Sequence, residues 1–463
     1  MGNQALSDIG KAYEWVSDNI KYFGGDKGRN GNQRLAKKED RHSKYPITIV
    51  GHGCGALALS LLQMPSRGYL PGGLGSDYKS HQVVLDGMSI LTLKLYLPLP
   101  LSQLWATQKV GAFHKCHQVV LDGMSILTLK ALEGVDNTGE SALNNLRLTQ
   151  ILAEKVGCPS ARDDPDATME CLKGIEASRL VRTAASLSRG RGPPNVFLPQ
   201  IYPPVEGFLY NPFRELKYQN ESQFRDTYAT FTSDAGSALL TTAFPKLFGA
   251  FGEKDVPLSA NCAKKVARRF LRKFPQTVAD ELLGDLDINA TTSNKDKLVQ
   301  VFGEAYFKCP MVYLGEYRND YKLDLEGRPK PKFYILEKKV NPPYNPFASW
   351  MGSVGFNTAQ INFPHPDGQI TVNNQTYKYT DEQKEQLRVN QKLLRSYMKL
   401  EKLPIPEFTL EEPAYSVMHL DGKISEEKTN FQSRNCEILR PYFKFHRDTY
   451  GTPFEYEPVF WFF

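Results

Sequence analysis

Apolar side chains near the N-terminus recur at the spacing of a single helical face and predict a helix over residues 5–20: Leu6, Ile9, Tyr13, Val16 and Ile20. The same spacing predicts helices over residues 142–156, 294–307 and 381–398. Short β-branched and aromatic runs predict strands over residues 46–50, 196–199, 227–231 and 333–336. Strands that alternate with helices, without a long linker between them, favour one α/β domain with a mostly parallel central sheet flanked by helices.

The predicted strand at 46–50 is followed by a glycine-rich turn and by an Ala/Leu-rich segment that predicts a helix to about Leu62. This is the strand–elbow–helix layout in which an α/β-hydrolase presents its nucleophile, at the central position of G-x-S-x-G. Gly53 occupies that position. Glycine can adopt the strained backbone of the elbow, but it has no oxygen with which to attack a carbonyl group.

One segment of the chain is duplicated, because the sequence of residues 81–94 recurs unchanged as residues 117–130. Two copies without a continuing period do not make a solenoid. A single buried strand position accepts only one copy, and the second copy has the better lead-in, at residues 111–115. We therefore expect the first copy to loop out or to form an extra layer. A duplicated exon and an error of gene assembly would both explain the repeat.

Composition and charge narrow the function classes. With 41% hydrophobic residues the chain can bury a sizeable core, and 57 basic against 51 acidic residues give a net charge of only +6. A charge this small on 463 residues argues against a nucleic-acid binder. The basic runs at 34–44 and 264–273 are interpreted as solvated faces, the second on an amphipathic helix that carries Val266, Phe270 and Phe274.

Neither a membrane segment nor a metal site is predicted. No secretory hydrophobic region follows Met1, and no run of about 18 apolar residues is present, because Lys94, Pro98 and Pro100 interrupt the most apolar stretch. No pair of cysteines has C-x-x-C spacing, so zinc is not expected. No cofactor is predicted.

Short stretches, in the same order along nearly the whole chain, resemble the type B carboxylesterase and cholinesterase family: Gly2–Leu6, Trp15–Val16, Asn19–Ile20, Phe23–Asp26, Thr48–Gly51, Ser66–Gly68, Leu152–Ala153, Gly157–Pro159, Glu170–Leu172, Cys309–Pro310 and Trp350–Gly352. The resemblance implies an α/β-hydrolase fold. The family places several strands and the oxyanion-hole glycines ahead of the helix with which this chain begins. We therefore expect residues 1–463 to form a single type B-like domain in which the N-terminal strands are missing.

The resemblance also implies where a catalytic triad would lie, and the chain departs from the family at all three positions. The family's elbow G-E-S-A-G-A corresponds to Gly51–Ala56, with Gly53 in place of the serine. The acidic member corresponds to Ala235, and the histidine of W-M-G-x-x-H-G-x-E corresponds to Gly355. None of these residues can titrate, so nucleophile, acid and base are all expected to be lost.

Four polar side chains near these positions are not expected to restore the chemistry. Cys54 lies one residue past the elbow apex and is interpreted as a structural thiol. His52 has no serine to serve and is interpreted as a hydrogen-bonded polar group. His365 lies on a Pro-flanked loop ten residues after the missing base, and Asp234 has no imidazole to orient.

The family's disulfides imply pairs between Cys158 and Cys171 and between Cys309 and Cys436, with buried free thiols as the alternative. Disulfides form in oxidising compartments, so the full-length protein is expected to be extracellular or at the cell surface. Three N-x-S/T sequons would then be candidate glycosylation sites: Asn220, Asn289 and Asn374.

Three interpretations of the function stay open. A hydrolase fold without its catalytic groups resembles the adhesion members of the family (neuroligins, glutactin, gliotactin and neurotactin). This resemblance implies cell-surface protein partners and a homodimer through C-terminal helices, with residues 381–398 as the candidate helix. The second interpretation is a carboxylic-ester hydrolase with displaced catalytic residues, and the third is a partial or misassembled gene product of the family.

Overall fold

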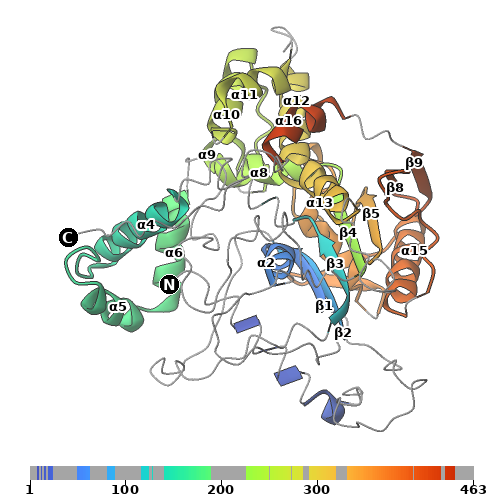
Figure 1. The fold of residues 1–463 in the computed structure, drawn as a ribbon, viewed down its shortest axis with the longest axis horizontal. Coiled ribbons are helices and arrows are strands. Elements are labelled where there is room, and N and C mark those ends of the chain that lie inside the picture. The colour runs from blue at the N-terminus through green and yellow to red at the C-terminus, as the bar shows by residue number, and fades with distance from the viewer. Residues whose placement is uncertain are drawn as a thin grey trace, which may run out of the picture.

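The computed structural model describes residues 49–62, 81–88, 116–124, 128, 140–188, 226–249, 251–272, 274–284, 291–319, 331–365, 367–399, 401–428 and 433–443, and parts of 8–23. Figure 1 shows a central sheet with helices on both sides and a separate group of three helices, α4 to α6, at the left. The strand predicted over residues 196–199 lies outside the described residues.

Within these ranges the main sheet has the strand order β1-β2-β3-β4-β5-β8-β9. All neighbouring strands are parallel except β8 and β9, which form an antiparallel hairpin. The strands are β1 (Ile49–Gly53), β2 (His81–Met88), β3 (Cys116–Asp122), β4 (Asp226–Thr232), β5 (Phe333–Lys338), β8 (Ala414–Met418) and β9 (Ile424–Lys428). A mostly parallel sheet covered on both faces confirms the fold class predicted from the sequence.

Side chains of β4 and β5 alternate between two hydrophobic cores, as the two-residue period of a strand requires. Ala229, Phe231 and Ile335 belong to the larger core. Tyr228 and Tyr334, which pair across the two strands, belong to the smaller one. Helices cover both cores, so the sheet lies between two layers of helices.

The larger core is covered by helices from most of the chain, and the smaller one by a single long helix. The first set comprises α2 (Cys54–Leu62), α8 (Ala235–Ala243), α9 (Pro245–Phe248), α10 (Ala260–Phe270), α11 (Gln276–Leu283), α12 (Thr291–Gly303), α13 (Cys309–Asn319) and α16 (Arg434–Phe443). The smaller core is covered by α15 (Asp381–Met398), which contributes Leu393, Leu394 and Tyr397. The helix predicted over residues 381–398 is therefore confirmed.

Three helices form a small core of their own: α4 (Glu140–Val156), α5 (Pro165–Gly174) and α6 (Ala177–Ser188). Asp164 starts α5 as an N-cap, because its carboxylate accepts a hydrogen bond of 2.8 Å from the backbone N–H of Ala167. A disulfide joins Cys158, just past α4, to Cys171 within α5. This pairing is the one that the family resemblance implies.

Several boundaries differ from the prediction. The first strand, β1, ends at residue 53 instead of 50, so it continues through the glycines of the elbow, while the predicted residues 46–48 lie outside the described ranges. The basic helix α10 ends at Phe270, and Phe274 lies beyond it but is buried in the same core. In the predicted N-terminal helix, the described positions between 8 and 19 are helical, and the 3-10 turn η1 (Ile20–Phe23) follows.

Both copies of the duplicated segment form strands of the main sheet, which corrects the expectation that the first copy loops out. β2 belongs to the first copy and β3 to the second, and the two strands pair in parallel. β1 pairs with both, since Gly51 is in register with Asp86 of β2 and with Leu121 of β3. Asp86 is the counterpart of Asp122 in the second copy, so the two registers with β1 differ by one residue.

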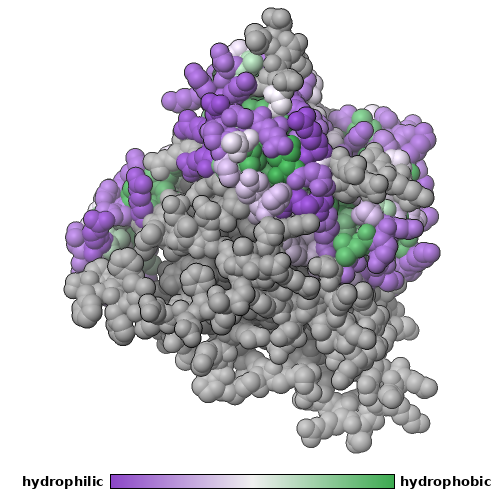
Figure 2. Space-filling view, turned by 45° about the horizontal axis from the view of Figure 1, so that its top comes forward, coloured by the Kyte–Doolittle hydropathy of each residue, from purple (hydrophilic) through white to green (hydrophobic). Residues whose placement is uncertain are grey.

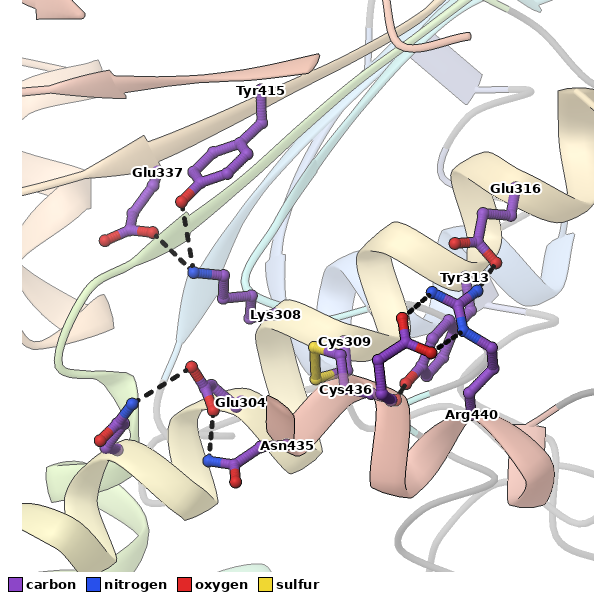
Figure 3. The surroundings of a disulfide bond; sticks show 12 residues. Glu304, Lys308, Cys309, Tyr313, Glu316, Glu337, Tyr415, Asn435, Cys436 and Arg440 are labelled. Atoms are coloured by element: carbon purple, nitrogen blue, oxygen red, sulfur yellow. Dashed lines mark hydrogen bonds and ion pairs between the residues drawn. A yellow bond between two sulfur atoms is a disulfide. The ribbon is translucent and has the colours of Figure 1, made fainter. Parts of the chain in front are cut away.

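The helix predicted over 294–307 is part of a longer helical run. α12 passes through a π-helical turn, η4 (Glu304–Lys308), directly into α13. At its end, buried Cys309 forms a disulfide with Cys436 of α16, which is the second pairing implied by the resemblance (Figure 3). Nearby, the amide Nδ2 of Asn435 donates to the carboxylate of Glu304 at 2.5 Å (Figure 3).

Candidate functional site

Three loops at the carboxyl ends of parallel strands carry the positions aligned with a catalytic triad. Gly53 ends β1 with a φ of 59°, the left-handed backbone of an elbow, and α2 begins at the next residue. Ala235 begins α8 just after β4. Gly355 begins the 3-10 turn η6 (Gly355–Asn357), in the segment that follows β5. Parallel strands end at one edge of a sheet, so these positions lie on the same side of the fold.

The turn after β4 is hydrogen-bonded to the segment after β5. Oδ2 of Asp234 accepts a hydrogen bond of 2.9 Å from the backbone N–H of Ser353. The hydroxyl of Ser237 donates to the carbonyl of Met351 at 2.8 Å. Gly352, with a φ of 64°, approaches so closely that a Cβ atom there would lie 2.6 Å from Oδ2 of Asp234. Asp234 therefore anchors the loop in which the family has its catalytic histidine.

The elbow is joined to the same segment through His52. Its Nδ1 lies 3.1 Å from Oγ1 of Thr358, at the start of α14 (Thr358–Asn362), and 3.5 Å from Oδ2 of Asp122, at the end of β3. The Thr358 hydroxyl lies 2.8 Å from that same carboxylate oxygen. All three side chains are buried. His52 is thus a hydrogen-bonded polar group, as the sequence predicts.

The buried polar cluster continues beyond Thr358. Nζ of Lys338, at the end of β5, donates to Oδ1 of Asn362 at 3.1 Å, and Nδ2 of Asn390 on α15 donates to the same oxygen at 2.8 Å. Nδ2 of Asn362 donates to Asp122 at 3.4 Å. Lys338 is only 1% exposed, and this burial lowers its pKa, against the opposing attraction of Asp122.

The pKa of His52 is lowered from 6.5 to about 4, mainly by burial; the Asp122 carboxylate opposes this shift and the positive charge of Lys338 adds to it. The imidazole is therefore neutral at physiological pH. Its approach to Asp122 is a polar contact and not an ion pair.

A hydroxyl, an imidazole and a carboxylate thus meet at the carboxyl end of the sheet, but they differ in arrangement from a serine-hydrolase triad. In a triad, one ring nitrogen faces the nucleophile and the other faces the carboxylate. Here Nδ1 of His52 faces both Thr358 and Asp122. The Thr358 side chain is fully buried. The arrangement suits a hydrogen-bonded support for the elbow.

The other two candidates lie apart from this cluster. Cys54 begins α2 as a half-buried free thiol, and burial raises its pKa, which disfavours the reactive thiolate. His365 is 53% exposed, and its Nδ1 lies 3.4 Å from Oδ2 of Asp367. The burial of Cys54 agrees with its interpretation as a structural thiol. Among the described residues, no group of three or more His, Cys, Asp or Glu side chains could hold a metal ion.

Sequence reasoning missed most of the polar cluster: Asp122, Lys338, Thr358, Asn362 and Asn390. Asp122 carried one signal, since a lone carboxylate directly follows the apolar run at residues 119–121 in the second copy of the repeat. The two asparagines lie on helices and carried none.

The elbow and the parallel sheet define this chain as a protein of the α/β-hydrolase class. A model of the carboxylesterase family matches residues 133–366, which is just over half of the chain. The chain belongs to the carboxylesterase family. It is also similar to Acetylcholinesterase-1 of Trittame loki, with 22% identity over 456 residues that cover 96% of this chain and 66% of that relative. The chain thus spans slightly less than two thirds of that relative's length.

Two further findings concern the predicted sequons and membrane-spanning helices. Asn374 is exposed at the turn between β6 (Gln369–Val372) and β7 (Gln375–Lys378), where a glycan could be attached, whereas Asn220 and Asn289 lie outside the described residues. In the part of the chain that the structure covers, no helix has the length and apolar character to cross a membrane.

Proposed function

We propose that this chain is a non-catalytic member of the carboxylesterase family that acts by recognising other proteins at the cell surface. One observation supports this most directly. The loops that carry nucleophile, acid and base in a hydrolase are in place and are joined by hydrogen bonds, yet the aligned positions hold Gly53, Ala235 and Gly355. Acyl transfer at these positions would have neither a nucleophile nor a base.

A recognition role follows from what the fold retains. The disulfides Cys158–Cys171 and Cys309–Cys436 suit an oxidising compartment, and with it an extracellular or cell-surface location. The family's adhesion members, namely neuroligin, glutactin, gliotactin and neurotactin, likewise combine a stable hydrolase fold with the loss of catalytic groups. By this analogy the partners are cell-surface proteins.

A fluorophosphonate probe, which labels activated serines, tests the proposal on the full chain. We expect no covalent labelling and no turnover of acyl esters above the buffer rate, while an active carboxylesterase is labelled in the same assay. Circular dichroism verifies that the unlabelled protein is folded. Labelling at any serine, identified by peptide mass spectrometry, would overturn the proposal.

A carboxylic-ester hydrolase with displaced catalytic residues is the second candidate. It is favoured by the family itself and by the contact between Thr358, His52 and Asp122. If the wild-type chain turns over an ester, Thr358→Val and His52→Gln test whether this cluster carries the activity. Loss of turnover in both variants, with the fold retained, would establish the hydrolase.

Dimerisation belongs to the same proposal. One side of α15 is already buried against the sheet, through Leu393, Leu394 and Tyr397. A homodimer through this helix would use its outward side, which carries charged residues such as Lys384 and Arg388. Sedimentation of the full chain at rising concentration measures whether dimers form.

We also propose that residues 1–463 form one type B-like domain. Sequencing of the transcript upstream of Met1 and across residues 60–135 tests this and the repeat together. A single copy of the repeat with an upstream signal sequence would show that the chain is a partial gene product.

A further inference from the structure

Helix α10 has one buried face and one basic face. Ala263, Val266, Ala267 and Phe270 are buried in the larger core. The α10 basic face consists of exposed residues on the helix and just past its end: Lys264, Lys265, Arg268, Arg269 and Arg272. Hydrophilic residues dominate the helical region at the top of Figure 2, around a smaller hydrophobic patch.

The positive charge of the α10 basic face is almost uncompensated. No Asp or Glu occurs between residues 256 and 272. Arg268 pairs with Asp280 of α11 at 3.1 Å, and the structure gives the other four cations no ion pair within the ranges it describes. On α15, by contrast, Lys384 pairs with Asp381 at 2.8 Å and Arg388 with Glu385 at 2.5 Å.

Helix stability does not explain this arrangement. Arg268 and Arg269 lie in the last turn of α10, where positive charge interacts favourably with the helix dipole. Lys264 and Lys265 lie in the middle of the helix, where the dipole gives no such benefit. Cations on the helix also stand four residues apart, from 264 to 268 and from 265 to 269, and like charges at this spacing destabilise a helix.

We propose that the α10 basic face binds a linear polyanion, specifically an anionic polysaccharide that bears sulfate and carboxylate groups. Residues four apart on a helix are separated by about 6 Å along its axis, so Lys264 and Arg268 form a row about 6 Å long, and Arg272 lies just past the end of the helix. Lys265 and Arg269 form a second row beside it. Guanidinium groups bind such anions through paired hydrogen bonds, and closely spaced cations concentrate a polyanion at the surface.

Two other polyanionic surfaces fit this face less well. A helix that lies on a lipid surface inserts exposed apolar side chains, but those of α10 are buried in the core. A protein at the cell surface meets polysaccharides and not nucleic acid. The choice of a polysaccharide over nucleic acid therefore rests on the proposed function, which places the protein there. An acidic protein segment offers the same charge, and the experiment separates it from a polysaccharide.

Binding of the full chain to heparin, as the sulfated polysaccharide, tests the proposal by calorimetry at about 0.15 M salt and at higher salt. One variant neutralises the four unpaired cations of the face and keeps Arg268: Lys264→Gln, Lys265→Gln, Arg269→Gln and Arg272→Gln. The matched control removes the same charge from exposed positions on and between α4, α5 and α6: Lys155→Gln, Arg162→Gln, Lys173→Gln and Arg182→Gln.

We expect the wild type and the control to bind heparin within about twofold of each other, and the α10 variant to bind about tenfold or more weakly, with a shallower salt dependence. Circular dichroism verifies that both variants are folded. Equal weakening in both variants, or no binding by the wild type at about 0.15 M salt, would overturn the proposal.

A second experiment measures binding of the same proteins to polyglutamate instead of heparin. Binding as tight as that of heparin, lost in the α10 variant, would assign the face to an acidic protein segment and overturn the polysaccharide. Neither arm depends on labelling by the fluorophosphonate probe, so failure here is distinguishable from failure of the non-catalytic assignment.

Discussion

The carboxylate of Asp234 accepts a hydrogen bond from the backbone N–H of Ser353 at 2.9 Å, and this bond holds the turn after β4 to the segment after β5. Asp234→Ala removes the acceptor and leaves a backbone donor without its partner. We expect the free energy of unfolding to fall by about 1–3 kcal/mol, as measured by chemical denaturation. Asp367→Ala, at a 70% exposed carboxylate, is the control and should change stability by no more than about 0.5 kcal/mol. Equal effects would contradict the anchoring role of Asp234.

Replacing either of two glycines in the same segment by alanine should change the protein's stability, but by different amounts. Gly352 has a φ of 64°, and an added Cβ would lie 2.6 Å from Oδ2 of Asp234, so Gly352→Ala should destabilise the protein by about 1–3 kcal/mol. At Gly355 the nearest atom to an added Cβ, Oγ1 of Thr232, is 3.8 Å away. Gly355→Ala should therefore be neutral or stabilise by up to about 1 kcal/mol. Thermal unfolding of the two variants measures the difference.

More of the fold than of the candidate site could be predicted from the sequence. α15 was predicted to the residue because its apolar spacing is regular and Thr380 with Gln383 forms a capping box at its start. The predicted end of β1, at residue 50, is three residues too early because Gly51 and Gly53 have low strand propensity. Pairing with the parallel neighbours β2 and β3 overrides that propensity.

The contacts of the site could not be read from local pattern. The contact between Thr358 and Asp122 joins residues 236 positions apart, and the cluster that holds it draws on β1, β3, β5, α14 and α15. Hydrophobic periodicity predicts which elements exist and which face is buried, but it does not predict which polar side chains meet once the elements pack. The disulfide pairs were anticipated only because the family resemblance supplied them.

The buried neutral His52 makes stability depend on pH in the acid range. Its pKa is about 4 in the folded protein, against 6.5 for an ordinary exposed histidine, so the unfolded chain binds the proton first as pH falls. Stability from this group is therefore fully present above pH 6.5 and is lost as pH falls toward 4, by about 3 kcal/mol.

Urea unfolding at pH 4.5 and at pH 7 measures this dependence. In His52→Gln the part of the pH dependence due to this imidazole should disappear, while Asp122, Lys338 and Thr358, which face the ring, are unchanged. His365→Gln, at an exposed imidazole, should keep the wild-type dependence. If both variants kept the same slope, the titration of His52 would not be its source.

Removing each of the two disulfides should lower the free energy of unfolding by a different amount. Cys309 and Cys436 are 127 residues apart, whereas Cys158 and Cys171 are 13 apart. In the chain-entropy account, opening the longer loop costs about 5 kcal/mol and opening the shorter loop about 3 kcal/mol. Paired Cys→Ala variants, compared by their unfolding midpoints in denaturant, measure the order. A larger loss from the shorter loop would show that local packing in the α4–α6 group, and not chain entropy, dominates.

The Cys309–Cys436 disulfide also determines how the protein would carry a mechanical load. Tension on the residues that follow α16 reaches Cys436 within the first turn of that helix, and the covalent bond passes it to Cys309 at the start of α13 (Figure 3). Cys309 is buried in the core that packs against the sheet. A pull on the C-terminal chain could therefore unwind residues 437–443 of α16, but the disulfide would pass the load at Cys436 to the core unless a reducing agent opened it.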